Sequence, residues 1–356
     1  MLLCGFLLLS LAGARVLAAE GLAVYAEAFA LLESETVVLG AYERDWQGST
    51  YRPGERAYAL VRAESGVRYR GWGLGRVWQR YQRLRFSESA ARLYYRVQNS
   101  LPLSNAAPYA VDVRLRSFAA NGLRVFASPV QTRRWRLRLG VTRLYAYDLL
   151  EGRLQGAVQA NGPRDYSFQD LMLDYVYARD AVFDRQVRAP RGQGWAFDAS
   201  IGWRPGPRLR LDLRLRDLAG RIDWFDAPHT AARVESDNRR YDENGYLRVD
   251  PTLSGRHDQL DYRQRLPWFG RLRLEAGAPS RAAVLEVVRS GVKSFVLLGL
   301  SRRLGGWWAQ VLYRPDRRAP ALRLARGGFS LGLASDALDW ARARYLSIEL
   351  GLRLTL

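Results

Sequence analysis

Cysteine is almost absent from this sequence: in 356 residues the only one is Cys4, near the start of the chain. Without paired cysteines there is no disulfide framework, so a protein of this size must be stabilised by burial or by a closed hydrogen-bonded architecture. Paired-cysteine zinc motifs, phosphate-binding loops, dinucleotide fingerprints and the acid spacing of a calcium loop are also missing. The sequence therefore predicts no metal site and no cofactor.

Long apolar runs are missing too, except at the N-terminus. Residues 2–12 are apolar, and the small residues up to Ala18 fit the cleavage rule of a secretory signal, so we predict a signal peptide over residues 1–18. A membrane anchor or a buried N-terminal strand is the alternative interpretation. Further along, no apolar run reaches about 18 residues, so no transmembrane helix is expected. We expect the exported chain to be one domain, residues 19–356.

Acidic residues are too few to balance the basic ones. The formal net charge is +20, and nearly all the cations are arginine, since Lys293 is the only lysine we find. Such a surplus favours nucleic acid, anionic lipid or an acidic ligand as a partner. The basic residues are spread along the chain and no nucleic-acid-binding module is recognisable, so we expect no nucleic-acid partner.

What the chain does have is alternation with a period of two. In the segment 208–216, leucines occupy every odd position, and arginines with one aspartate occupy the even positions. The segments 134–141 and 271–276 repeat this pattern of arginines alternating with apolar residues. A strand separates such residues onto two faces, whereas a helix would distribute them around its circumference. The pattern predicts an all-β fold of amphipathic strands.

Weaker alternating segments lie between turn signals. Hairpin turns are expected at Asn121-Gly122, Asn161-Gly162, Pro205-Gly206 and Gly305-Gly306. Further strands are expected at 35–44, 56–70, 74–85, 109–117, 121–128, 143–160, 165–178, 194–204, 258–266, 281–289, 293–302, 305–314 and 328–335.

Three segments do not fit a simple strand. Residues 87–103 begin with Ser87, a suitable helix N-cap, and fit a short helix as well as a strand. Residues 23–34 are equally ambiguous. The segment 226–258 carries both histidines and is too polar and long for a turn, so we expect an extended loop here, with room for a small hairpin around Asn244-Gly245.

Alternation does not say which face is outside. A soluble sandwich would bury the leucines, whereas a membrane barrel would turn them toward lipid. The predicted export, the lack of cysteine and the many strands of about ten residues favour a transmembrane, antiparallel, up-and-down β-barrel. At about 20–25 residues per strand with its connections, the chain has room for roughly 14–16 strands. An exported soluble β-protein remains the alternative.

The last twelve residues, "YLSIELGLRLTL", alternate throughout. This segment resembles the C-terminal assembly signal of Gram-negative outer-membrane β-barrels, although Leu356 stands where that family most often has phenylalanine. The phrase "LRLRDLAGRIDW" at 213–224 also resembles a strand and turn of FadL-like and TraF-type barrels. The resemblance implies an outer-membrane location, contact with lipid and lipopolysaccharide, and recognition by the barrel-assembly machinery. The residues that would carry the signal are Tyr345, Leu350, Leu352, Leu354 and Leu356.

If leucines face lipid, the arginines must face inward, because one arginine on the lipid face at mid-bilayer costs about 2–4 kcal/mol. Such a lumen would attract anions and reject cations, which predicts an anion-preferring pore or a binding cavity for acidic or amphiphilic solutes. A salt-bridged, non-conducting barrel that docks partners in secretion, conjugation or surface assembly is the alternative. The predicted lumen-facing residues are Arg134, Arg136, Arg138, Arg208, Arg210, Arg214, Arg216, Arg271 and Arg273.

Catalysis is the least favoured class of function. His229 and His257 have carboxylates and Ser254 nearby in sequence. A catalytic histidine needs an oriented carboxylate together with a nucleophile or a water. The surrounding sequences, "DAPH" and "GRHD", do not match patterns of outer-membrane proteases or lipid hydrolases, so we expect no enzyme.

Overall fold

We describe a computed structural model of the chain, which covers residues 21–241 and 247–356. The predicted signal peptide at 1–18 and the turn around Asn244-Gly245 lie outside these residues. The strands are β1 (Leu22–Ser34), β2 (Arg56–Tyr69), β3 (Trp72–Phe86), β4 (Tyr109–Gln131), β5 (Trp135–Ala160), β6 (Tyr166–Tyr177), β7 (Arg191–Gly206), β8 (Leu209–Tyr241), β9 (Leu247–Arg265), β10 (Phe269–Ala278), β11 (Arg281–Arg289), β12 (Ser294–Leu304), β13 (Trp307–Arg314), β14 (Ala319–Arg326), β15 (Phe329–Ser335) and β16 (Tyr345–Thr355).

In the described ranges, one α-helix, α2 (Glu88–Gln98), and three short 3-10 helices, η1 (Leu39–Arg44), η2 (Pro315–Arg317) and η3 (Trp340–Arg342), join strands. The α-helix begins where the sequence offered a cap: Ser87 is extended, and its side chain accepts a hydrogen bond from the backbone N–H of Ala90. Of the two readings left open for 87–103, the helix is therefore present. Within the described residues, no helix is both long and apolar enough to cross a membrane.

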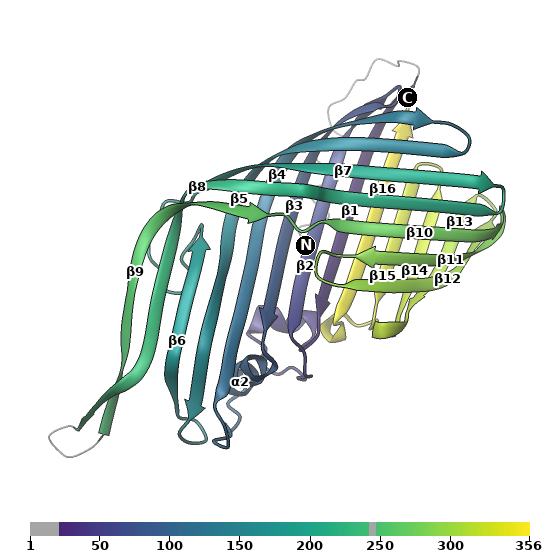
Figure 1. Cartoon of the computed structure of the whole chain (residues 1–356). Coiled ribbons are helices and arrows are strands. Elements are labelled where there is room, and N and C mark those ends of the chain that lie inside the picture. Colours follow the sequence, from purple (N-terminus) through teal and green to yellow (C-terminus); the bar gives the residue numbers. More distant parts are fainter. Residues whose placement is uncertain (1–20, 242–246) are drawn as a thin grey trace.

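Fourteen strands close into a barrel (Figure 1). The ring runs through β1–β5, continues through β7, β8 and β10–β16, and returns to β1 through an antiparallel pairing in which Ala30 faces Ile348. Closure satisfies the backbone groups of the first and last strands, which would otherwise form free edges. The predicted transmembrane, antiparallel all-β barrel of about 14–16 strands is confirmed, and its up-and-down order is broken at two places.

At those two places the sheet forks into an extension, which consists of β6, β9 and the adjoining parts of β4, β5 and β8. Strand β5 pairs with β7 up to Ala146 and with β6 from Leu150 onward. Asp148 sits at this fork with φ 61°, and Asp226 sits at the corresponding fork of β8 with φ 51°. Aspartate tolerates the left-handed region better than most residues, so these two positions allow the strands to bend away from the ring (Figure 1).

The extension corrects several sequence-based expectations. Residues 226–241 and 247–258 are not a loop; they form most of the β8–β9 hairpin. The predicted strand at 35–44 is largely replaced by η1, and Asn121-Gly122 lies inside the continuous strand β4 instead of at a turn. Strand β14 was not predicted. The errors at Asn121-Gly122 and at 226–258 share a cause, because Asn-Gly and polar residues are typical of turns and loops but also occur inside long strands.

The apolar faces of the strands point outward. On β12 and β13, Leu300 is 67% exposed and Val311 is 63% exposed, and they face each other across the two strands. The inward positions of the same strands, such as Ser301 and Gln310, are buried. A contiguous apolar exterior around a charged interior is the arrangement of a membrane-spanning barrel. The soluble sandwich, which would bury these leucines together, is excluded.

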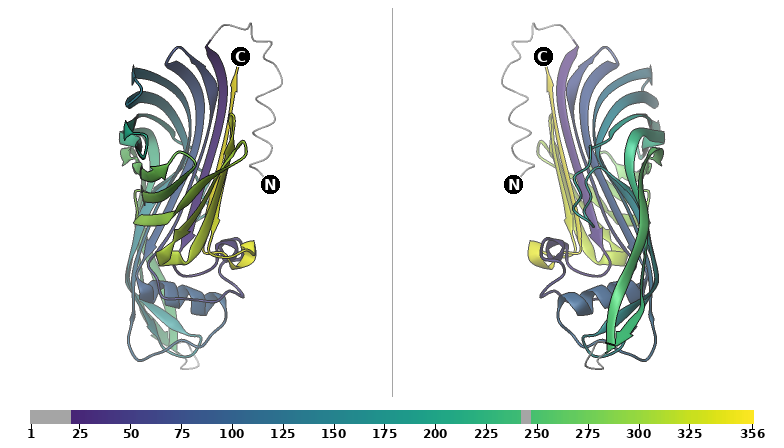
Figure 2. Two further views of the ribbon diagram at one scale, coloured as in Figure 1. Left: turned by 90° about the vertical axis from the view of Figure 1, so that its right-hand side faces the viewer. Right: turned by 90° about the vertical axis from the view of Figure 1, so that its left-hand side faces the viewer.

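The two ends of the barrel differ. At the end where β1 starts and β16 finishes, the turns are short; we call this the short-turn end (70–71, 132–134, 207–208, 279–280, 305–306 and 327–328). At the opposite, long-loop end lie α2, the three 3-10 helices and the extension. Figure 2 shows that the helices and the lower part of the sheet extension occupy the same end of the molecule, away from the C-terminus.

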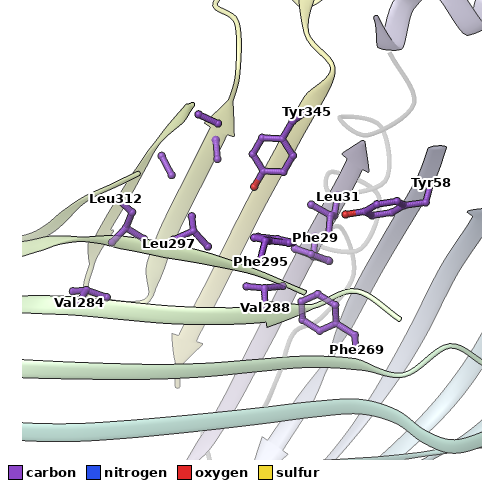
Figure 3. Packing of buried hydrophobic residues seen from close by; sticks show 13 residues of the cluster. Phe29, Leu31, Tyr58, Phe269, Val284, Val288, Phe295, Leu297, Leu312 and Tyr345 are labelled. Atoms are coloured by element: carbon purple, nitrogen blue, oxygen red, sulfur yellow. The ribbon is translucent and has the colours of Figure 1, made fainter. Parts of the chain in front are cut away.

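Apolar side chains also fill part of the interior. Phe29, Phe269 and Phe295 form one buried cluster with Leu31 and Tyr345, and Figure 3 shows these side chains converging from strands on different sides of the ring. A second cluster contains Tyr81, Phe118 and Trp224 among its members. The lumen is therefore filled in its middle and open only in separate cavities.

Candidate functional site: the arginine-lined lumen cavity

The lumen holds a cavity of about 410 Å³ near the short-turn end, which we call the lumen cavity. It is built by inward residues of β1, β2, β4, β5, β7, β8, β15 and β16. Among its lining residues, eight are arginines and four are carboxylates. The arginines are Arg68, Arg124, Arg136, Arg138, Arg210, Arg214, Arg216 and Arg353, and the carboxylates are Glu27, Glu64, Asp198 and Asp212.

Several of these arginines lack a carboxylate partner. Within the described chain, Arg68, Arg138, Arg214 and Arg353 form no ion pair, whereas Arg210 Nε lies 2.5 Å from Asp212. Arg138 also leaves its buried Nε without a hydrogen-bond partner, and its guanidinium lies over the Phe126 ring at 5.0 Å. A cavity wall with unpaired guanidinium groups carries a positive potential that favours an anionic occupant.

The floor of the lumen cavity is a buried charge network. Arg124 donates from Nη1 to Glu64 at 2.7 Å and from Nε to Asp198 at 2.7 Å. Arg62 lies deeper, 3.5 Å from Glu64 and Asp198 and 3.4 Å from Asp217. Two arginines against three carboxylates leave this floor close to neutral or slightly negative. The positive excess of the lumen is thus confined to the cavity above the floor.

A second network of buried ion pairs fills the other half of the lumen. Arg323 pairs with Glu286 at 2.6 Å and with Glu349 at 3.1 Å, while Arg271 reaches Glu349 at 2.5 Å and Glu286 at 3.3 Å. These four side chains come from β10, β11, β14 and β16 and cross-link strands that are far apart in the sequence. Because buried ion pairs need such complete mutual pairing, this half of the lumen is a structural filling and offers no free charge.

A third charged cluster lies at the long-loop end, around Glu33. Arg314 donates to Glu33 at 2.8 Å and Arg317 donates at 2.6 Å. Arg314 also binds Asp316, on η2, at 2.8 Å and 3.0 Å. Partial burial alone would raise the pKa of Asp316, but hydrogen bonds from Arg314 and Lys293 outweigh burial and lower this pKa to about 2.

The nine predicted lumen arginines fall into three groups. Arg136, Arg138, Arg210, Arg214 and Arg216 line the lumen cavity. Arg271 and Arg273 also point inward, but both are held by carboxylates, Arg273 by Glu275 at 2.5 Å. Arg134 and Arg208 lie in turns at the short-turn end and are exposed. The pattern of alternation alone could not locate where a strand ends, which is why Arg134 and Arg208 were included.

The residues of the C-terminal segment lie on both faces of β16. Leu350, Leu352 and Leu354 face outward, and Tyr345 faces inward into the apolar cluster around Phe295. Leu356 follows the strand, and its N–H donates to the carbonyl of Leu22 at 3.0 Å.

Sequence reasoning missed the residues that organise the floor. Arg62, Glu64 and Arg124 lie on strands with irregular composition, and Asp198 and Asp217 are single acids in otherwise apolar or basic surroundings. The available signal was that each charged residue shares the strand face of other polar residues. Which acid meets which arginine depends on the ring closure, which no local pattern contains.

Both histidines lie on the extension. His229 is held between Asp258, 2.6 Å from Nδ1, and Asp174, 3.1 Å from Nε2. His257 Nδ1 lies 3.0 Å from the carbonyl oxygen of His229. In the part of the chain that the structure describes, no hydrogen bond joins either ring to Ser254, and no group of three or more His, Cys, Asp or Glu residues is placed to hold a metal ion.

Comparison with known proteins gives no match to a family model or to a curated protein. Solved structures with a similar fold include the TodX deltaS2S3 mutant monoaromatic hydrocarbon channel, at 8% identity over 94% of this chain and 90% of that chain, with a TM-score of 0.45. The toluene transporter TodX of Pseudomonas putida has 9% identity over 95% and 90%, with a TM-score of 0.36. The CymD monoaromatic hydrocarbon channel has 9% identity over 94% and 87%, with a TM-score of 0.32. Likeness at this level concerns architecture and does not extend to the solute.

Proposed function

We propose that the protein is an outer-membrane barrel that takes up a solute carrying an anionic group, and that the lumen cavity binds that group. The observation that carries this proposal is the unpaired state of Arg68, Arg138, Arg214 and Arg353 in the lumen cavity. Arg68 and Arg138 are half-buried and Arg214 and Arg353 are exposed to the cavity, so together they offer an anion a positive charge that no carboxylate neutralises. Phe126, against which Arg138 packs, gives the same site an apolar surface for an amphiphilic solute.

The proposed orientation follows from the two ends. In outer-membrane barrels the periplasmic turns are short and the external loops are long. The lumen cavity would then open toward the periplasm, with the extension outside the cell. The filled middle of the lumen means that passage requires rearrangement of side chains around Arg62, so transport would be gated and not free diffusion through an open pore.

Contacts with the membrane and its assembly machinery are part of this proposal. Near the fork of β5, the exposed Trp195 ring lies under the guanidinium of Arg143 at 4.7 Å, and Trp78 Nε1 donates to Tyr147 at 2.9 Å. Aromatic residues beside a basic residue suit the lipid headgroup level, where lipopolysaccharide phosphates are located. The outward leucines of β16, the strand that closes the ring, would be the part read by the barrel-assembly machinery.

The test is selectivity in planar bilayers. Purified full-length protein would be recorded under a potassium chloride gradient, and the reversal potential should report chloride preference. The double variant R138Q/R214Q removes two unpaired charges from the lumen cavity and should reduce that preference. The matched control is R302Q/R303Q, which removes the same charge from the exposed end of β12. A wild-type protein whose openings prefer cations, or an R138Q/R214Q variant that prefers chloride as strongly as wild type, would refute the proposal.

A further inference from the structure

A second large cavity lies at the long-loop end, where the extension leaves the ring. Its volume is about 980 Å³, and we call it the extension cavity. It is formed by one face of β3–β6, β8 and β9. Seven arginines line it against two carboxylates, Glu151 and Asp174; the arginines are Arg83, Arg85, Arg114, Arg116, Arg153, Arg233 and Arg256.

Four of these arginines form a block on two neighbouring strands. Arg83 of β3 lies directly opposite Arg116 of β4, and Arg85 lies directly opposite Arg114. Like charges in opposite positions destabilise a sheet, and directly opposite residues have Cβ atoms only about 5 Å apart. Arg153 of β5 then lies opposite Arg114, which extends the row of cations to a third strand.

Local carboxylates neutralise only part of this block. Asp112 binds Arg114 at 3.3 Å and Arg153 at 3.1 Å, and Glu151 pairs with Arg116. Arg83 and Arg85 form no ion pair with any residue of the described ranges. On this face of the cavity, two guanidinium groups without a carboxylate partner lie beside two that share theirs, so the site lacks an acceptor with negative charge.

We propose that the extension cavity binds an anion carrying at least two phosphate or carboxylate groups, with one group on the Arg83–Arg116 pair and another on the Arg85–Arg114 pair. Each planar guanidinium can donate two parallel hydrogen bonds to such a group, and one ligand spanning both pairs relieves both repulsions at once. The cavity is far larger than a single phosphate needs, and Met172 and Tyr262 line it as well, so the ligand has a body beyond its charged groups.

This site is independent of transport through the lumen. The extension cavity lies at the long-loop end, and the lumen cavity lies at the short-turn end; the buried cluster with Tyr81, Phe118 and Trp224 belongs to the interior between them. Two sources supply the proposed chemistry: a free polyanion in solution, or the phosphorylated headgroup of lipopolysaccharide in the same membrane.

The experiment measures binding to full-length protein by calorimetry, with inorganic tripolyphosphate as the free probe. In a second arm, the probe is phosphatidylcholine vesicles that contain lipopolysaccharide. The variant R83Q/R85Q should weaken the binding of the effective probe by about ten- to a hundred-fold, since it removes charged hydrogen bonds worth that much. The matched control R302Q/R303Q removes the same charge from the exposed end of β12 and should bind like wild type. Binding that R138Q/R214Q weakens and R83Q/R85Q leaves unchanged would belong to the lumen cavity instead.

Retention of the folded band on an unboiled gel verifies that R83Q/R85Q still closes its barrel, which is expected because the change removes like-charge repulsion. Tripolyphosphate binding that is lost in the variant assigns a free polyanion, and a loss seen only with the vesicles assigns the headgroup. If neither probe binds wild-type protein, or if folded R83Q/R85Q binds as tightly as wild type, the proposal is wrong.

Discussion

Arg62 and Asp217 are 155 positions apart in the sequence, yet Arg62 Nη1 lies 3.4 Å from Asp217 Oδ1 inside the barrel. Both side chains are buried, and Arg62 is the only cation within ion-pair distance of Asp217 among the described residues. The contact joins β2 to the bulge of β8, where Asp217 has φ 57°. It therefore ties the wall of the ring to the strand that leaves it.

We expect Arg62→Met to destabilise the protein by about 3–5 kcal/mol, because it leaves Asp217 buried without a counter-charge. The measurement is the free energy of unfolding by urea in detergent micelles. The double variant R62M/D217N should recover a large part of the loss, since the uncompensated charge is gone. A single variant as stable as wild type would contradict the assigned role of the pair.

The outward face of β12 should reject charge. Leu298 is 49% exposed and faces Leu285 and Tyr313 on the neighbouring strands, so Leu298→Arg would place a guanidinium against lipid. We expect a loss of about 2–4 kcal/mol in unfolding free energy, measured in lipid bilayers. Leu253 is the matched control, because it is 54% exposed but lies on the extension; there the same change should cost less than about 0.5 kcal/mol. Equal costs at both positions would overturn the placement of the membrane.

Acid should weaken the cluster around Glu33 through Asp316. The pKa of Asp316 is about 2 in the folded protein and 3.8 in its ordinary state, so its stabilisation is complete above pH 4 and is lost as the pH falls through about 2. Because the carboxylate is partly exposed, we expect solvent screening to limit the contribution to about 1 kcal/mol. Unfolding measured between pH 2 and pH 5 should show a smaller pH dependence in Asp316→Asn than in wild type. An unchanged slope would show that Asp316 does not contribute.

The cap of α2 can be tested locally. Ser87→Ala removes the acceptor for the N–H of Ala90 and should cost about 0.5–2 kcal/mol of helix stability. Hydrogen exchange of the α2 amides should accelerate accordingly. Ser89→Ala is the control, since Ser89 also donates to the carbonyl of Ala110 but caps no N–H. Similar exchange in the two variants would mean that the contact with Ala110, and not the cap, holds the helix.

The period-two pattern was enough to predict the barrel and the inward direction of arginines such as Arg138 and Arg214, because the face of a strand is a local property. The direction of the leucines followed from the cost of a charge in lipid. The first argument needs only the alternation of neighbouring residues, and the second needs only the assumption that one face of the sheet contacts lipid.

The remainder depends on pairings that the sequence does not encode locally. Strand β5 changes partners at Asp148, and residues 226–258 look like a loop because both faces of that hairpin are polar. The extension cavity arises only when β3, β6 and β9 are brought into one sheet. Arg83 and Arg85 therefore gave no signal beyond being basic residues on a predicted strand.

Strand β9 pairs with β8 alone among the described strands, so its other side presents backbone donors and acceptors that only water can satisfy. This limits how much of the barrel wall the hydrocarbon layer can cover, because covering the free edge of β9 would remove the water that its backbone groups need. A bilayer with longer acyl chains would therefore have to thin locally around the barrel. The hydrocarbon thickness that suits the protein is thus limited by β9, a strand that has to stay in water.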